Sequence, residues 1–255
     1  MNTNPLTDAV HAARVLRLPI VAEQAGTLAD QARDEHWTHE EYLAALLARQ
    51  AAAREANGAT TRLRRAHFPR VATLEDFNFA YQPSAPRALI EHLATSTFVT
   101  KADNIILLGP PGVGKTHLAI ALGMKACQHG HSVLFKTAAD WITDLGDAHT
   151  HGLLATRLND LDRVNLIIID ELGYLPLNAD AANLMFQLVS ARYETASIII
   201  TSNLDFARWG ETLSDPTIAA ALIDRLIHHA EIIALKGDSY RTRNRRTQQT
   251  TTMKP

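Results

Sequence analysis

The chain is poor in cysteine and has no long apolar run. Cys127 is the single cysteine among 255 residues, which excludes an internal disulfide framework and any metal site built from several thiolates. We interpret Cys127 as a packed residue of a helix. No segment approaches the roughly 20 apolar residues that cross a bilayer, and residues 1–5 lack the basic flank and apolar core of a signal peptide. We therefore expect a cytoplasmic protein with no membrane partner.

Acidic and basic residues nearly balance, but they are unevenly distributed. The formal net charge is −2, and 46% of the residues are hydrophobic, as in an ordinary globular protein. One acid-free cluster holds Arg62, Arg64, Arg65 and Arg70, and another holds Arg241, Arg243, Arg245, Arg246 and Lys254. Local positive charge attracts the phosphate backbone of nucleic acids, whereas many basic loops and tails are simply solvated. Both interpretations stay open for each cluster.

Three helical patterns occur before residue 60. Pro19 suits the first turn of the second helix, and Thr38 with Glu41 forms a capping box for the third. The pair Asn57-Gly58 is predicted to end the third helix. Residues 1–66 therefore read as a small helical domain, which either binds DNA or a partner protein or serves as a cap on the main domain.

A linker, a larger domain and a tail follow. Prolines predict an ordered linker over residues 67–87, whose aromatic residues pack on the next domain or cover a nucleotide base. Residues 88–238 alternate apolar strands with helices, which predicts a parallel sheet covered on both faces. The strands are expected near Asn104–Leu108, Ser132–Phe135, Leu166–Ile169, Ser197–Ile200 and Glu231–Leu235. Residues 239–255 are predicted to be a flexible basic tail.

A glycine-rich loop between the first predicted strand and a helix fits the pattern G-x-x-x-x-G-K-S/T. Such a loop points backbone N–H groups at an anion, and the helix dipole adds to the attraction. We expect Lys115 to reach the β- and γ-phosphates of a nucleotide and Thr116 to ligate Mg²⁺. A plain strand–helix junction is the alternative. The predicted nucleotide contacts of the loop are Gly109, Pro110, Pro111, Gly112, Val113, Gly114, Lys115, Thr116 and His117.

Two acids end the third predicted strand, and an asparagine follows the fourth. Asp170 is expected to hold Mg²⁺, and Glu171 to position or deprotonate the attacking water. Asn203 would orient that water if its strand lies between the strands that carry the loop and the acids. The alternatives are an acid pair that caps a turn and an asparagine that forms one. Two adjacent acids favour hydrolysis of the nucleotide over simple binding.

These features match the AAA+ ATPases, and several further runs resemble one branch of them. The likeness to the IstB family, the ATPase helpers of insertion-sequence transposition, is carried by residues 114–119, 170–176, 201–203, 224–229 and 239–241. The helical start and residues 74–77 are also similar to that family. The resemblance therefore covers nearly the whole chain. It implies an α/β AAA+ P-loop core, with a five-stranded parallel sheet and no full helical lid, after a small all-α domain.

The resemblance also implies an activity and partners. It implies an Mg²⁺-dependent ATPase that forms homo-oligomers on double-stranded DNA, largely without sequence specificity, and assists a transposase encoded by the same element. The cofactors would be ATP and Mg²⁺, and the setting a bacterial cytoplasm, with nucleoid association on DNA. Arg225 would be an arginine finger that reaches a neighbouring subunit, unless it forms an ion pair with Asp224 or Glu231. Arg241 would contact either nucleotide phosphate or DNA backbone.

The sequence indicates the DNA contacts less clearly than the nucleotide contacts. The segment Asp144–Leu161 would hold an additional helical insertion, in which His149 and His151 are interpreted as solvated rather than metal-bound. The candidate backbone contacts are Arg62, Arg64, Arg65, Lys101, Lys136, Arg157, Arg243, Arg245 and Arg246. A helicase loader of the DnaC type is the nearest alternative function, and a small-molecule P-loop kinase is a more distant one.

Overall fold

The computed structural model describes residues 4–174, 176–213 and 216–240. The chain divides into two compact units, residues 1–61 and 62–255. The predicted domain boundaries at residues 66, 87 and 238 stay predictions. Arg241, Arg243, Arg245, Arg246 and the rest of the predicted tail after Tyr240 lie outside the described residues.

The first unit is made of three helices: α1 (Pro5–Val15), α2 (Pro19–Asp34) and most of α3 (His39–Arg65). The predicted capping box is present, because the Thr38 N–H donates to Glu41 Oε2 at 2.7 Å and the Glu41 N–H donates to Thr38 Oγ1 at 3.2 Å. A small apolar cluster forms around Ala25, Leu28 and Leu46.

The predicted end of the third helix at Asn57-Gly58 is wrong, because α3 continues through this pair to Arg65. A glycine inside a helix costs only about 1 kcal/mol relative to alanine. The helix-forming residues around it outweigh that cost, and no proline follows to stop the helix. The hydroxyls of Thr60 and Thr61 donate to the carbonyl oxygens of Ala56 and Asn57, four residues earlier, as they do within a continuous helix.

The second unit is built on a parallel five-stranded sheet, which confirms the predicted fold. Its order is β2-β3-β4-β1-β5. The strands are β1 (Asn104–Leu108), β2 (Val133–Thr137), β3 (Leu166–Leu172), β4 (Ser197–Ser202) and β5 (Ala230–Ala234). Each one overlaps its predicted range. Because β4 lies between β1 and β3, residues that follow these three strands converge at one edge of the sheet.

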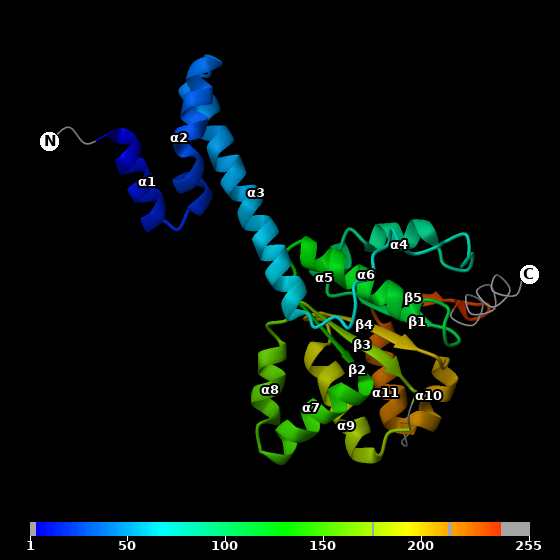
Figure 1. The fold of residues 1–255 in the computed structure, drawn as a ribbon. Coiled ribbons are helices and arrows are strands. Elements are labelled where there is room, and N and C mark those ends of the chain that lie inside the picture. Colours follow the sequence, from blue (N-terminus) through cyan, green and yellow to red (C-terminus); the bar gives the residue numbers. More distant parts are fainter. Residues whose placement is uncertain (1–3, 175, 214–215, 241–255) are drawn as a thin grey trace, which may run out of the picture. The chain divides into compact units, whose positions relative to one another are not determined.

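Helices cover both faces of this sheet (Figure 1). One apolar cluster joins Ile105 and Leu107 to α6, while Ile106 and Ile200 face the helices of the other side, as expected for strands buried on both faces. The helices of this unit are α4 (Arg87–Leu93), α5 (Thr97–Thr100), α6 (Lys115–Gln128), α7 (Ala138–Thr150), α8 (Leu154–Leu161), α9 (Ala179–Arg192), α10 (Phe206–Thr212) and α11 (Pro216–Ile227).

The segment before α4 is packed against the first of these clusters. Phe68, Leu74, Phe77 and Phe79 are partly buried there, and the Phe77 and Phe79 rings meet edge to face at 4.9 Å. Phe77 and Phe79 are therefore packed on the second unit, and the covering of a nucleotide base by an aromatic residue of this segment stays a prediction.

Arg192 is a buried cation that the sequence did not indicate. It ends α9 with 1% of its surface exposed, and its guanidinium donates to the carbonyl oxygens of Leu161, Val164 and Ser197 at 2.8–3.2 Å. Burial lowers the pKa of Arg192 to about 10. The side chain ties the end of α8 to the start of β4.

Replacing Arg192 with methionine should destabilise the second unit by about 3 kcal/mol, because three carbonyl oxygens lose their donor. Urea unfolding followed by circular dichroism measures this. The matched control is Arg208→Met on the exposed surface of α10, where Arg208 forms an ion pair with Glu211, and it should leave stability nearly unchanged. Equal stability of the two variants would contradict a structural role for Arg192.

Candidate nucleotide-binding site

Three glycines shape the loop between β1 and α6. Gly109, Gly112 and Gly114 have φ angles of 146°, 84° and 105°, in the region that favours glycine. A Cβ atom would lie 2.2 Å from the Leu235 carbonyl oxygen at Gly109, 2.2 Å from Ser239 Oγ at Gly112, and 2.7 Å from the Phe77 ring at Gly114. The glycines are therefore needed where other parts of the chain itself approach the loop.

Lys115 opens α6 and folds back over this loop. Its Nζ donates to the carbonyl oxygens of Gly109 at 2.6 Å and Pro110 at 2.8 Å, and the side chain is 9% exposed. The first turn of α6 contains no acidic residue, and no side chain caps it. An ammonium group and the N-terminus of a helix thus meet at the loop, which suits an anion such as a phosphate.

The Asp170 carboxylate joins two threonines from distant parts of the chain. Thr116 Oγ1 lies 2.9 and 3.1 Å from its two oxygens, and Thr201 Oγ1 donates to Oδ1 at 2.6 Å. Asp170 is 4% exposed. The structure therefore brings together the predicted magnesium ligands Thr116 and Asp170. Their oxygen atoms are the hard ligands that Mg²⁺ prefers.

Glu171 is exposed although it directly follows the buried Asp170, and the backbone is irregular at this point. Its φ angle is +62°, and the register between β3 and β4 shifts between Ile169 and Leu172. The Glu171 N–H donates to Thr201 Oγ1 at 2.9 Å, and the residue is exposed. One acid is thus buried and the other faces solvent, so the two carboxylates have different environments.

Thr201 is a residue of this site to which the sequence analysis assigned no role. It is fully buried, and its hydroxyl donates to Asp170 while accepting from the Glu171 backbone. A role for Thr201 could have been inferred from its place in the sequence, two residues before Asn203 and at the end of a strand that neighbours β3.

Asn203 follows β4, the strand between β1 and β3, so the topological condition placed on it is met. Its Oδ1 atom is buried and has no hydrogen-bond partner among the described residues. A buried acceptor without a donor costs about 1–3 kcal/mol. Such an atom suits a site in which a ligand or an ordered water supplies the missing donor.

A cavity of about 340 Å³ lies beside the loop. The segment before α4 forms one wall and the chain after β5 forms another. Gln82 Nε2 donates to the Val113 carbonyl, the Tyr240 N–H donates to the Gly112 carbonyl, and the Tyr81 and Tyr240 rings meet at 4.8 Å. The lining residues are Arg70, Asp76, Phe77, Asn78, Tyr81, Gln82, Gly112, Val113, Gly114, Lys115, Thr116, His117, Asp238 and Tyr240.

His117 holds one wall of this cavity in place. Its Nε2 lies 2.7 Å from the Thr73 carbonyl oxygen, and its ring meets Phe77 at 5.5 Å. These contacts fasten the segment before α4 to the first turn of α6.

Arg225 lies at the other edge of the sheet. It is in the last turn of α11, and the chain then enters β5. The start of β5 lies beside Asn104, the first residue of β1, whose side chain donates to the Leu226 carbonyl. Strand β1, of five residues or about 16 Å, separates this edge from the glycine-rich loop. The guanidinium packs 4.5 Å over the Phe186 ring, and no ion pair with Asp224 or Glu231 forms between these described residues.

Comparison with known proteins identifies the family. A family model described as IstB-like ATP binding protein matches residues 11–248. The chain belongs to this family. It is 43% identical over 231 residues to the ATP-binding protein of insertion sequence IS21 from Pseudomonas aeruginosa, covering 91% of this chain and 87% of that one. It is 40% identical to the ATP-binding protein of IS5376 from Geobacillus stearothermophilus, covering 92% and 93%.

Solved structures confirm the AAA+ fold of this IstB-like protein. The DnaC helicase loader aligns with a TM-score of 0.52 at 24% identity, over 60% of this chain and 90% of that one. AMPPCP-bound DnaA from Aquifex aeolicus aligns with a TM-score of 0.54 at 21% identity, over 71% and 54%. Identities this low show the fold alone. No helix among the described residues has the length and apolarity to span a membrane.

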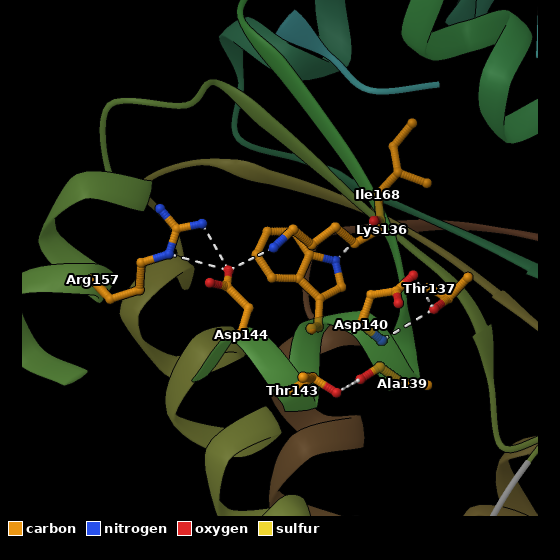
Figure 2. A network of polar contacts seen from close by, with 9 residues as sticks. Lys136, Thr137, Ala139, Asp140, Thr143, Asp144, Arg157 and Ile168 are labelled. Carbon is orange, nitrogen blue, oxygen red and sulfur yellow. Dashed lines mark hydrogen bonds and ion pairs between the residues drawn. The ribbon is translucent and has the colours of Figure 1, made fainter. Parts of the chain in front are cut away.

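Two candidate DNA contacts of this family member share one carboxylate (Figure 2). Lys136 Nζ and Arg157 Nη2 each lie 2.7 Å from Asp144 Oδ2. Burial raises the pKa of Asp144, but the hydrogen bonds from Arg157 and Lys136 outweigh it, so that the pKa is lowered overall. Lys136 also lies 5.1 Å from the centre of the Trp141 ring. These cations therefore already have an intramolecular role, which brings α8 against α7.

The remaining basic candidates differ in exposure. Arg64, Arg65 and Lys101 are exposed, whereas Arg62 is half-buried and its Nε donates to the Cys127 carbonyl at 2.7 Å. Burial raises the pKa of the Cys127 thiol to about 11, in agreement with a packed rather than a catalytic cysteine.

Replacing Thr201 with valine should reduce ATP turnover by about 10- to 100-fold, because the Asp170 carboxylate loses a donor and the Glu171 N–H loses its acceptor. Thr201→Ser is the matched control: it keeps the hydroxyl and should retain most of the activity. Turnover is measured against Mg²⁺ concentration, since an Asp170 carboxylate that holds Mg²⁺, as the sequence predicts, would need more of the ion for half-maximal rate once weakened. Equal activity of the valine and serine variants would contradict this role for Thr201.

Proposed function

We propose that this protein is an ATPase that assembles on duplex DNA when ATP is bound and assists the transposase of an insertion sequence. The proposal is carried by one observation: Lys115, Thr116, Asp170, Glu171 and Asn203 converge at one edge of the sheet. Family membership supports binding of ATP. The named relatives are ATP-binding proteins of insertion sequences, which supports the transposition context.

Each residue at this edge has a proposed task in hydrolysis. Lys115 and the backbone N–H groups of the loop would hold the β- and γ-phosphates, and Thr116 with Asp170 would hold Mg²⁺. The bound ion would supply positive charge against the phosphate oxygens. The exposed Glu171 carboxylate would accept a proton from the attacking water, and Asn203 would orient that water.

The placement of Arg225 supports completion of the site by a neighbouring subunit. This guanidinium lies at the sheet edge opposite to the chain's own loop, so it would act on the nucleotide of another copy. Hydrolysis would then depend on assembly, and the state of the nucleotide would set the oligomeric state. Arg241 would contact phosphate or DNA.

DNA would be held mainly through phosphate contacts. Among the described residues, the stronger candidates are the exposed Arg64, Arg65 and Lys101. Binding of DNA by Arg62, Lys136 or Arg157 would first require these side chains to break their contacts within the chain. Arg243, Arg245 and Arg246 stay candidates. Contacts of this type predict binding that weakens steeply with salt and depends little on sequence.

A DnaC-like helicase loader is the alternative, because the fold is the same. Copurification separates the two: the proposed function expects a transposase as partner, and the alternative a ring helicase. A small-molecule kinase would instead be indifferent to DNA.

Glu171→Gln should lower the rate of ATP hydrolysis by about 100-fold or more, because the proton acceptor is lost. DNA binding and ATP-dependent assembly should persist, because nothing else is removed. We would measure ATPase rate and particle size with and without duplex DNA, in ATP and in a non-hydrolysable analogue. For the wild type we expect turnover stimulated by DNA and large assemblies on duplex. A monomer indifferent to DNA would refute the proposal, and unchanged hydrolysis in Glu171→Gln would refute the role of that residue.

Mixing two inactive variants tests completion in trans. Lys115→Ala should fail to bind ATP, and Arg225→Ala should bind ATP without hydrolysing it. The mixture should recover part of the turnover, because Arg225 of the first variant can reach the intact loop of the second. Arg208→Ala, an exposed arginine outside the site, serves as the control and should keep full activity. No recovery on mixing, in assemblies shown to contain both variants, would argue against a finger supplied by the neighbour.

A further inference from the structure

A second cluster of ligand-type side chains lies far from the nucleotide site. Glu194 follows α9, and His228 and His229 lie between α11 and β5. Among the described residues these three form the one group of histidine, cysteine and acidic side chains whose ligand atoms all lie within 4.8 Å of one another. The cluster forms because both connections lead into the same starting edge of the sheet, at β4 and β5.

The geometry of the cluster is close to that of a metal site. His228 Nδ1 lies 3.6 Å and His229 Nε2 3.9 Å from Glu194 Oε1. Ligand atoms at about 2.0–2.1 Å from a tetrahedral ion lie about 3.4 Å from one another. The required adjustment is therefore small. All three side chains are more than half exposed, at 53–54%, so they can rotate without disturbing the core.

The backbone and neighbouring groups also favour convergence on one point. Glu194 has a φ angle of +59°, an uncommon conformation for glutamate that turns the chain sharply after α9. The two imidazole rings meet nearly at right angles, with centroids 4.3 Å apart. The Tyr193 hydroxyl lies 3.0 Å from His228 Nδ1, a contact that an ion bound at this nitrogen would replace.

We propose that Glu194, His228 and His229 bind a divalent transition metal of the zinc class. Two imidazoles and one carboxylate suit zinc, cobalt or nickel, whereas magnesium and calcium prefer oxygen ligands alone. Three protein ligands leave one coordination position open to water or to a group from another molecule. The ion would connect the end of α9 to the end of α11.

Metal binding at this site would also affect Arg225, which lies nearby. This arginine precedes His228 by three residues on α11, and its guanidinium packs on Phe186 of α9. An ion that joins the ends of the same two helices would hold this pair together and so restrict the movement of Arg225. Metal binding itself does not depend on the proposed ATPase function.

Direct binding to the full chain tests the proposal, with any affinity tag removed and the protein stripped by a chelator. Zinc is titrated in competition with a chromogenic chelator, and cobalt is added separately for its absorption spectrum. We expect one tight equivalent of zinc, a tetrahedral cobalt spectrum, and a rise in Tm on zinc addition.

Two double variants separate a built site from adventitious binding. Glu194→Gln/His229→Gln should lose at least about 10-fold in zinc affinity and the rise in Tm, and being exposed these residues can change without unfolding the protein. The matched control is His149→Gln/His151→Gln, a second histidine pair, near the end of α7, that belongs to no such cluster among the described residues. It should bind as the wild type does. Equal zinc affinity in all three proteins, or an octahedral cobalt spectrum, would overturn the proposal.

Discussion

The nucleotide site depends on one buried carboxylate. Asp170 accepts hydrogen bonds from Thr116 on α6 and from Thr201 on β4. Thr201 also accepts the Glu171 N–H, so that the residue proposed for metal binding and the one proposed for catalysis are set by the same hydroxyl. A buried charge is tolerated only with such partners. The arrangement therefore holds the glycine-rich loop, β3 and β4 in one geometry, and the proposed chemistry requires all three.

The parallel sheet gives the second unit two chemically different edges. The carboxyl ends of β1, β3 and β4 collect the groups proposed to bind phosphate and activate water, whereas the starts of β4 and β5 collect Arg225 and the cluster of Glu194, His228 and His229. Strands in a parallel sheet share one direction, so groups that follow strands and groups that precede them lie at opposite ends of the strands. The proposed site, which uses both, would therefore need a second copy.

Short segments on either side of the loop close the nucleotide cavity. The segment before α4 is held by His117 and Gln82, and the chain after β5 is held by the bond from the Tyr240 N–H to Gly112. The glycines of the loop admit both segments, because a Cβ at Gly112 or Gly114 would collide with them. The resemblance implied a core without a full lid, and these packed segments show how such a core still encloses a cavity.

The sequence by itself determined the features that depend on near neighbours along the chain. Periodicity located all five strands, the pattern of glycines located the loop, and Thr38 with Glu41 marked the start of α3, because these signals reflect local backbone conformation and helix capping. The end of α3 was missed, since a single glycine is too weak a signal against the residues around it. Only the tertiary structure decided which strands are neighbours. That order gave Thr201 its two partners, and the packing of helices and connections against the sheet paired Asp144 with Lys136 and Arg157, buried Arg192, and placed Glu194 beside His228 and His229. The contacts of Thr201 join residues 30 and 31 positions apart, and those of Asp144 join residues 8 and 13 positions apart on different elements. No local pattern encodes either set.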